Sequence, residues 1–317
     1  MRAVSVCITC YNEADYIGCA IRSVLKQTAI DQIKEIIVVD DGSIDGSDLR
    51  IRELATGDVP LVHIAQPNRG LPAARNTAMR SATGKYIAFL DGDDFWEPRK
   101  IASQLTAFDT PSVGLVYSDY VDFQTPDSRN QMMICVRRLS GQGDDLVREF
   151  FVHDGPIMPS SVMVRREVLQ QIGGFNEYYR IGEDTDYWIR VALGGFGFQH
   201  VPGGLVYKRR HERNITRDLE RFIGVFEEHT HHYAERCDFL RPLVARRLSR
   251  RYAKIGQSLL ASGRLRRAST YLARALQHDI RNPRVYAYIG AMPLYAVGGP
   301  NVLDGPKRAY HLLRSKA

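Results

Sequence analysis

The first two hundred residues alternate short apolar runs with segments of helical periodicity, and this alternation limits the fold most strongly. The apolar runs cover residues 4–9, 36–40, 59–66 and 86–90, and the helical segments cover 15–27, 47–56 and 71–82. Continuous apolar runs of this length are typical of parallel strands buried on both faces. Because strands that alternate with helices form doubly wound α/β sheets, we expect a Rossmann-like mixed sheet here.

Polar residues directly follow three of these runs. They are Thr9-Cys10-Tyr11-Asn12-Glu13, Asp40-Asp41-Gly42-Ser43 and Asp91-Gly92-Asp93-Asp94. Open α/β sheets bind ligands beyond the carboxyl ends of their strands. The sequence therefore predicts a nucleotide site at this edge of the sheet.

The Asp91-Gly92-Asp93 triplet is the strongest local signal for chemistry. Two carboxylates at the end of a buried strand can share one hard divalent cation, and Mg²⁺ or Mn²⁺ accepts substrate phosphates as further ligands. Such a cation would neutralise charge on a leaving diphosphate. A bare triplet of this kind is also common in solvated acidic turns, and the apolar strand before it favours the metal site.

The rest of the chain divides at about residue 216. Strand-like segments at 114–120, 131–139, 162–165 and 198–201 belong to the first part, so we expect a domain over residues 1–215. Helices are predicted at 218–236, 240–262, 264–278 and 283–297, which gives a C-terminal α-helical subdomain over 216–317. Part of it resembles a single helical hairpin of the tetratricopeptide type, and a plain helical subdomain is the alternative.

Charge is distributed unevenly between these parts. Residues 205–317 hold 23 Lys and Arg against 9 Asp and Glu, whereas residues 1–204 hold 20 against 27. No apolar run is long enough to span a bilayer, and the N-terminus lacks the features of a signal peptide, so we expect a cytoplasmic protein. Cys7 and Cys10 have no second pair at zinc spacing and are predicted to be core residues.

Four segments together resemble the family 2 glycosyltransferases. They are VSVCITCYNE at 4–13, VVDDGSIDGS at 38–47, NRGLPAARNTA at 68–78 and GKYIAFLDGDD at 84–94. The resemblance is dense over the first hundred residues and sparse to about residue 215. It implies the GT-A fold and an inverting transfer of a sugar from a nucleotide-sugar donor.

The resemblance also implies roles for the residues at the strand ends. Thr9 and Tyr11 would line the base pocket, and Asp41 would accept the imide N–H of uracil or thymine, a donor that cytosine lacks at that position. Asp91 would contact the ribose or the metal, and Asp93 would bind the metal. Arg75 would lie near the base or the diphosphate, whose geometry an Arg fork matches. Tyr11 as a packed aromatic and Arg75 as the partner of a surface acid are the structural alternatives.

A second acidic motif, Gly182-Glu183-Asp184-Thr185-Asp186, precedes a predicted helix. The resemblance implies that Asp184 is the catalytic base, because an inverting displacement needs a carboxylate opposite the leaving diphosphate. Helix capping by Asp184 is the alternative. Glu183 would position the acceptor, Asp186 would support the base, and the apolar ring of Trp188 would help to raise the base's pKa.

Two further segments complete the predicted site. Ser160, in Pro159-Ser160-Ser161, resembles a residue on the acceptor side, with an ordinary turn as the alternative. His211, in the segment from Arg209 to Asn214, would be a third metal ligand or a phosphate contact, whereas a lone loop His is usually solvated.

The resemblance thus predicts transfer from a UDP-sugar, or a dTDP-sugar, to a saccharide or lipid-linked acceptor during cell-surface polysaccharide or glycolipid assembly. The basic C-terminal helices suit either peripheral contact with an anionic membrane or homo-oligomer formation. No motif supports nucleic-acid binding. A nucleotidyltransferase would carry a Gly-rich basic loop after the first strand, where this chain has Thr9-Cys10-Tyr11. A non-catalytic nucleotide-sugar-binding protein is the other rival, and the intact acidic set argues against it.

Overall fold

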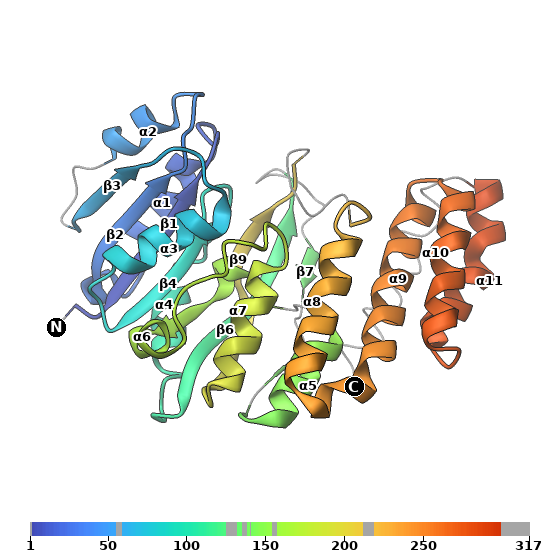
Figure 1. Cartoon of the computed structure of the whole chain (residues 1–317). Helices are drawn as coiled ribbons and strands as arrows, with labels where there is room; N and C mark the ends of the chain where they lie inside the picture. The colour runs from blue at the N-terminus through green and yellow to red at the C-terminus, as the bar shows by residue number, and fades with distance from the viewer. Residues whose placement is uncertain are drawn as a thin grey trace. The chain divides into compact units, whose positions relative to one another are not determined.

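The computed structural model describes residues 2–54, 59–124, 132–134, 138–139, 141–153, 157–211 and 219–298. The chain divides into two compact units (Figure 1). Unit 1 comprises Met1–Phe150 and Gly155–Arg217, and unit 2 comprises Phe151–Asp154 and Asp218–Ala317.

The described strands of unit 1 form one mixed sheet in the order β3-β2-β1-β4-β8-β6-β9-β5, with β7 paired to β6. The strands are β1 (Val4–Cys10), β2 (Ile33–Asp40), β3 (Leu61–Ala65), β4 (Tyr86–Asp91), β5 (Phe95–Trp96), β6 (Val113–Phe123), β7 (Met132–Ile134), β8 (Met163–Arg165) and β9 (Gly197–Arg209). The first four pair in parallel, and β8 joins them antiparallel to β4. The predicted strand over 131–139 is described only in part, as β7.

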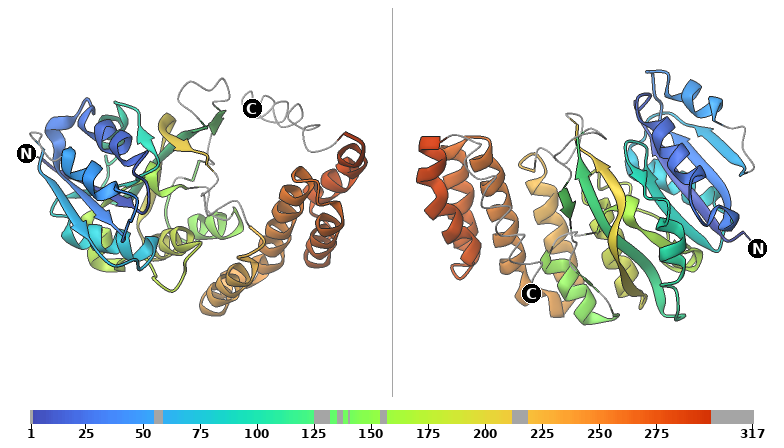
Figure 2. Two further views of the ribbon diagram at one scale, coloured as in Figure 1. Left: turned by 90° about the horizontal axis from the view of Figure 1, so that it is seen from above. Right: turned by 180° about the vertical axis from the view of Figure 1, so that it is seen from behind.

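Helices cover both faces of this sheet, as the front view of Figure 1 and the rear view of Figure 2 show together. The helical elements of unit 1 are α1 (Ile17–Leu25), η1 (Ile30–Gln32), α2 (Ser47–Glu53), α3 (Leu71–Ser81), α4 (Lys100–Leu105), η2 (Pro159–Ser161), α6 (Arg166–Ile172), α7 (Glu183–Leu193) and most of α5 (Asp144–His153). Every residue of β1 is buried, as expected for a strand covered on both faces. Its Cys7 and Cys10 are buried free thiols, in agreement with their prediction as core residues.

The register of β1 and β4 positions the polar clusters. Thr9 pairs with Asp91 across these strands, and Cys10 pairs with Asp40 of β2. Since the strands are parallel, their carboxyl ends and the residues that follow lie at the same edge. The mixed α/β sheet with both faces covered confirms the predicted fold class.

Unit 2 is helical among its described residues. Its elements are α8 (Ile223–Arg236), η4 (Asp238–Leu243), α9 (Val244–Ala261), α10 (Leu265–His278) and α11 (Pro283–Gly298). The helices α9 and α10 form a close hairpin, because a Cβ atom added at Gly256 would come within 2.7 Å of the Leu272 side chain. The apolar core includes Leu260, Ala268 and Leu272. The predicted C-terminal helices are therefore present.

One arginine of α9 belongs to the interior of unit 2 and not to its basic surface. Arg247 is 1% exposed. Its Nε donates to Thr230 Oγ1 at 2.8 Å, and its guanidinium lies 4.4 Å from the centre of the Phe226 ring. The sequence shows a run of arginines here and gives no sign that one of them points inward. No helix among the described residues is long and apolar enough to cross a membrane.

Candidate active site

The ends of β1 and β4 begin the site. Thr9 Oγ1 lies 3.4 Å from Asp91 Oδ1, the acceptor of its hydrogen bond. The Asp91 side chain is 25% exposed, so the carboxylate faces solvent while its strand is buried. Its backbone N–H donates to Ser160 Oγ at 3.0 Å, which fixes the turn that follows β4.

Arg75 of α3 joins the end of β4 to the start of α7. Its Nη2 donates to Asp91 Oδ1 at 2.8 Å, and its Nη1 donates to Glu183 Oε1 at 2.7 Å. The Arg75 side chain is only 3% exposed, and its buried Nε finds no hydrogen-bond partner among the residues that the structure describes. The charges of Asp91 and Glu183 raise the pKa of Arg75 further above its usual range. Arg75 thus pairs with acids of the predicted site, not with a surface acid.

Asp93 faces the imidazole of His211, two residues beyond the end of β9. His211 Nε2 lies 2.8 Å from Asp93 Oδ2. Burial and the charge of Asp91 raise the pKa of Asp93, while the contact with His211 opposes that rise. The His211 ring stacks on Tyr16 at 5.4 Å between centroids, so an aromatic support holds the imidazole near the turn. Arg213 of the same predicted loop lies outside the described residues.

Asp94 and Ser160 form a support beneath the acidic turn. Ser160 is fully buried, and its Oγ donates to Asp94 Oδ2 at 2.8 Å. Asp94 Oδ1 accepts the backbone N–H of Arg209 at 3.0 Å, which ties the end of β9 to the turn. Ser160 therefore lies below Asp91 and Asp94 in this structure. The sequence contained Asp94 in its motif but gave no reason to separate its role from those of Asp91 and Asp93.

Glu13 is an acid of the site that the sequence interpretation did not single out. Its Oε2 is buried and has no hydrogen-bond partner in the described part of the chain. Burial, followed by the charges of Asp93 and Asp91, raises its pKa well above the usual value. A Cβ atom added at Gly92 would overlap Glu13 Oε2 and come within 2.9 Å of the Thr9 carbonyl oxygen, so a side chain here would displace the carboxylate and press on the strand backbone. Glu13 ends the family segment VSVCITCYNE at 4–13, and this position was the sequence signal that could have identified it.

This donor set fits a hard divalent cation that also binds phosphate. Asp91 and Asp93 could supply the carboxylate oxygens that both Mg²⁺ and Mn²⁺ prefer, and His211 could supply an imidazole nitrogen, which Mn²⁺ accepts more readily than Mg²⁺. Within the part of the chain that the structure describes, no group of three or more His, Cys, Asp or Glu side chains is arranged to hold a metal by itself. Ligands from a diphosphate and water would then complete the coordination, as is usual for Mg²⁺.

Asp41 organises the loop before α3. Its Oδ1 accepts Gln66 Nε2 at 2.7 Å and the Arg69 N–H at 2.9 Å, and its Oδ2 accepts the Gly70 N–H at 2.8 Å. A carboxylate has about four lone-pair positions, so the side chain can accept one further N–H. Gln66 was not singled out from the sequence.

Tyr11 is 49% exposed at the end of β1 and is therefore not a packed core aromatic. The neighbouring Asn12 has φ of 54°, and its Oδ1 accepts the Ile44 N–H at 2.9 Å. This contact joins the segment after β1 to the segment after β2. The exposed Tyr11 ring is thus held on a fixed backbone beside the strand ends.

The helix α7 carries the second acidic motif. Asp184 is partly exposed, and its Oδ1 accepts the adjacent Thr185 N–H at 2.6 Å. The N-cap of α7 is Gly182, so Asp184 lies within the first turn of the helix and is not its capping residue. Glu183 is buried against Arg75, and burial together with the Asp184 charge raises the pKa of Glu183 to about 7.

Two further residues of α7 lie behind these acids. Asp186 accepts a hydrogen bond from Arg190 Nε at 2.8 Å. Trp188 is fully buried and donates to the Ile157 carbonyl at 3.2 Å, so it lies in the core behind these acids.

A clamp from α3 fixes the loop that leads to α7. Asn76 Nδ2 donates to the Phe175 carbonyl at 2.9 Å, and Asn76 Oδ1 accepts the Phe175 N–H at 2.7 Å. Asn76 Nδ2 also donates to Glu177 Oε1 at 3.0 Å, and Arg69 forms an ion pair with Glu177 at 2.8 Å. The segments before and within α3 therefore hold the loop at two points. Neither contact was foreseen from the sequence.

Most of the predicted residues thus meet at the ends of β1, β4 and β9 and the start of α7. The sequence profile described as glycosyl transferase family 2 matches residues 5–173, which is more than half of the chain. The chain belongs to glycosyltransferase family 2. This membership confirms the resemblance seen in the four sequence segments.

Several proteins with similar sequences are described as glycosyltransferases. The Escherichia coli UDP-Glc:alpha-D-GlcNAc-diphosphoundecaprenol beta-1,3-glucosyltransferase WfaP is 38% identical over 121 residues, which are 38% of this chain and 47% of that protein. The glycosyltransferase RP339 of Rickettsia prowazekii is 32% identical over 232 residues, which are 71% of this chain and 69% of that protein. Matches to relatives from Mycobacterium tuberculosis, Nostoc and Rickettsia felis span 62%, 34% and 30% of those proteins, less than two thirds of each.

Solved structures share the fold. The mannosyltransferase PcManGT from Pyrobaculum calidifontis, in complex with GDP-Man and Mn²⁺, has a TM-score of 0.62 at 20% identity, covering 99% of this chain and 84% of that chain. Residues 1–349 of S. aureus TarS, in complex with UDP-GlcNAc, have a TM-score of 0.63 at 18% identity, covering 93% of this chain and 92% of that chain. These likenesses confirm the GT-A fold.

Proposed function

We propose that this protein is an inverting, metal-dependent glycosyltransferase that moves a sugar from a UDP-sugar, or a dTDP-sugar, to an acceptor hydroxyl. The observation that carries the proposal is the Arg75 bridge, which links Asp91 at the end of β4 to Glu183 at the start of α7. This bridge brings acids suited to a cation-bound diphosphate near Asp184, the proposed base. A donor and an acceptor could then meet between the two acidic groups.

Donor binding is assigned to the strand ends. Tyr11 and Thr9 would flank the base, and the remaining acceptor position of Asp41 would take the imide N–H of uracil or thymine. Asp91 and Asp93, with His211, would hold Mg²⁺ or Mn²⁺. When bound, the cation would neutralise charge on the departing diphosphate. The buried Arg75, 2.8 Å from Asp91 Oδ1, would hold that carboxylate in place beside the donor.

The transfer is assigned to Asp184. The acceptor hydroxyl gives its proton to the Asp184 carboxylate, and its oxygen forms a bond to the anomeric carbon. The bond between that carbon and the diphosphate oxygen breaks on the opposite side, so the anomeric configuration inverts. Glu183 would orient the acceptor beside Asp184, and Asp186 with Trp188 would support the start of α7 from below.

The acceptor is proposed to be a saccharide or a lipid-linked saccharide in cell-surface polysaccharide or glycolipid assembly, on the cytoplasmic side. The description of WfaP, which names a diphosphoundecaprenol acceptor, supports this class. The helix α11 exposes Tyr286, Ile289 and Leu294. The exposed cations of α9 and α10 are Arg246, Lys254, Arg266, Arg267 and Arg274. Such a surface suits either an anionic membrane interface or a second copy of the chain. Binding to anionic but not to neutral vesicles would favour the membrane over the homo-oligomer.

A donor panel with product analysis tests the proposal. We expect turnover of one UDP- or dTDP-sugar with Mn²⁺ or Mg²⁺, and proton NMR of the product should show inverted anomeric configuration. The Asp184→Asn variant should lose about 10²–10⁴-fold in kcat, which is the usual contribution of a general base, while still binding the donor. The matched variant Asp145→Asn, which changes an exposed acid in the first turn of α5, should retain full activity. Full activity of Asp184→Asn, a retained configuration, or nucleotidyl transfer from a triphosphate would each contradict the proposal.

A further inference from the structure

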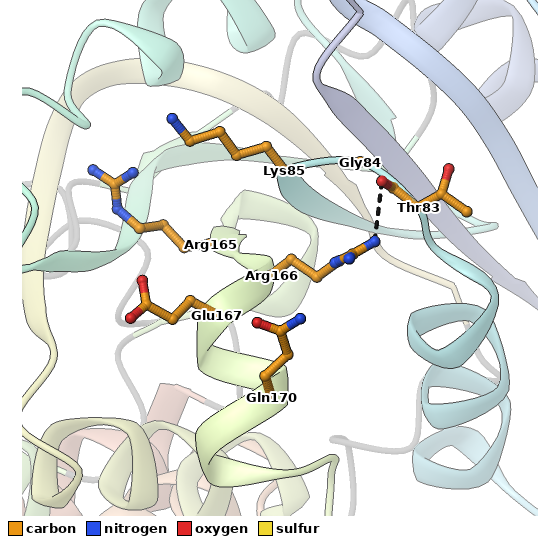
Figure 3. Close-up of a pocket in the computed structure, with 7 residues that line it drawn as sticks. All are labelled: Thr83, Gly84, Lys85, Arg165, Arg166, Glu167 and Gln170. Carbon is orange, nitrogen blue, oxygen red and sulfur yellow. Dashed lines mark hydrogen bonds between the residues drawn. The ribbon is translucent and has the colours of Figure 1, made fainter.

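A hollow of about 370 Å³ lies at the end of β4 opposite to Asp91. Its lining consists of Thr83, Gly84, Lys85, Arg165, Arg166, Glu167 and Gln170 (Figure 3). Tyr86 at the start of β4 pairs with Arg165 at the end of antiparallel β8, which brings the two lining segments together. Five residue steps along β4 separate Tyr86 from Asp91, or about 17 Å, so this hollow is distinct from the proposed donor site.

Three cations and one acid line this hollow. Lys85 is exposed, and its ammonium lies 5.5 Å from the centroid of the Tyr86 ring. Arg166 uses one nitrogen, Nη1, to donate to the Thr83 carbonyl at 3.1 Å. The acid, Glu167, accepts Gln171 Nε2 at 2.9 Å. Within the described ranges, none of the three lining cations has an ion pair with a carboxylate.

The Arg165 guanidinium is fixed by the protein. Its Nε donates to the Val113 carbonyl at 2.7 Å, and its Nη2 donates to the Thr110 carbonyl at 2.9 Å. It also packs against the rings of Phe108 and Tyr86, at 5.1 and 5.7 Å from their centroids. Its Nη1 makes no hydrogen bond to the part of the chain that the structure describes. A guanidinium held in this way is ordered before a ligand arrives, which lowers the entropic cost of binding.

The positive hollow stands out against the charge of its surroundings. Residues 1–204 hold 20 Lys and Arg against 27 Asp and Glu, yet the lining residues hold three cations against one acid. The neighbouring Lys34 and Glu35 both contact Thr83 and add no net charge. Figure 3 shows Lys85 and Arg165 extending on one side of the hollow, while Arg166 crosses toward Thr83. Convergent Arg and Lys groups of this kind match the oxygens of a phosphate.

We propose that this hollow binds a phosphate group at a site separate from the donor site. Arg165 would contribute the fixed contact, and Lys85 and Arg166 would close on the remaining oxygens. The phosphate would belong either to a small soluble compound or to a lipid headgroup, since both present the same oxygens. The proposal does not depend on the identity of the transferred sugar.

Calorimetric titration at constant ionic strength measures the affinity of the whole chain for inorganic phosphate and so tests this site. The variants are Lys85→Ala and Arg166→Ala, and the matched control is Arg80→Ala, which removes an exposed charge from α3 outside the hollow. Arg165 is left unchanged because its side chain ties several carbonyls together. We expect millimolar binding, an approximately tenfold loss in each of the two variants, and no change in the control or in UDP affinity.

Flotation with phosphatidylglycerol vesicles and with phosphatidylcholine vesicles distinguishes the two sources. Flotation with phosphatidylglycerol that Lys85→Ala and Arg166→Ala reduce, and Arg80→Ala does not, identifies a lipid headgroup. Phosphate binding that the two variants weaken, with no such effect on flotation, identifies a soluble phosphate. Absence of both effects, or equal losses in Arg80→Ala, would overturn the proposal.

Discussion

Strand β4 carries carboxylates at its C-terminal end and cations at its N-terminal end. Asp91 and Asp93 lie in a network in which the buried Arg75 and His211 hold their oxygens. Lys85, by contrast, is exposed, and Arg165 donates to carbonyls instead of to an acid. Arg75 and Glu183 are buried, so water cannot readily replace a partner that either of them loses, whereas Lys85 at the second end is exposed to water.

This difference predicts that removal of the buried charge of Arg75 will destabilise the fold, while removal of the exposed charge of Lys85 will affect only ligand binding. A substitution tests the comparison best when an exposed residue of the same type serves as its control. We expect the largest effect in the network around Arg75 and the smallest effect at the hollow.

The largest effect is expected from Arg75→Met, which leaves the carboxylates of Asp91 and Glu183 without their shared cation. Breaking a buried pair by removing one partner typically costs about 3–5 kcal/mol of the free energy of unfolding. Urea denaturation of this variant and of Arg80→Met, an exposed change in the same helix, measures the difference. Arg80→Met should stay within about 0.5 kcal/mol of the wild type. Similar losses in the free energy of unfolding for Arg75→Met and Arg80→Met would show that the buried arginine stabilises the fold no more than the exposed one.

The second effect depends on pH and concerns Glu183. Burial and the Asp184 charge raise the pKa of Glu183 to about 7, from 4.5 in the unfolded chain. Since the folded chain binds this proton more tightly, the contribution of Glu183 to stability is greatest below pH 4.5 and falls as the pH rises toward 7. Relative to Glu183→Gln, the wild type should therefore lose up to about 3 kcal/mol across this window. A difference between the two proteins that stays flat from pH 4.5 to 7 would contradict the assignment.

A smaller loss is expected from Asn76→Ala, which removes the contacts that hold the loop before α7. Buried hydrogen-bonding groups left without a partner cost about 1–3 kcal/mol. The control is Asn176→Ala, an exposed residue of the same loop whose side chain accepts one local N–H, from Tyr178. Thermal unfolding and kcat measured together should show both stability and turnover reduced in Asn76→Ala only. Equal behaviour of the two variants would mean that the clamp does not position α7.

The smallest effect is expected at the other end of β4. Arg165→Lys keeps the charge but loses the fork that contacts the Val113 and Thr110 carbonyls. A loss of about 1 kcal/mol in the free energy of unfolding is expected, with unchanged sugar transfer. A loss of transfer activity in this variant would show that the two ends of the strand are coupled.

The layout of the sheet could be predicted because its signals are local. A continuous apolar run specified β1, and the acids after β4 followed from the end of that strand. The predicted strand over 59–66 is longer than β3 (Leu61–Ala65), because polar residues at a strand end do not show where pairing stops. The family segments identified the residues that meet at the strand ends, and their chemical roles remain predictions.

The contacts between distant segments could not be predicted from one sequence. Arg75 and Glu183 are separated by 108 positions, and nothing near either residue indicates that they pair. Asn76 and Phe175 are separated by 99 positions, and Arg247 is buried within a run of arginines. Such pairs depend on how helices pack against the sheet, which periodicity does not specify.

We propose above all that the acids after β4 hold a cation-bound nucleoside diphosphate. Calorimetric titration of UDP into the wild type and into Asp93→Ala, each with Mn²⁺ and with EDTA, tests it most directly. In the wild type we expect Mn²⁺ to tighten UDP binding at least about tenfold, a difference of about 1.4 kcal/mol. In Asp93→Ala we expect Mn²⁺ to leave the affinity for UDP unchanged. Equal UDP affinity under all four conditions would contradict it.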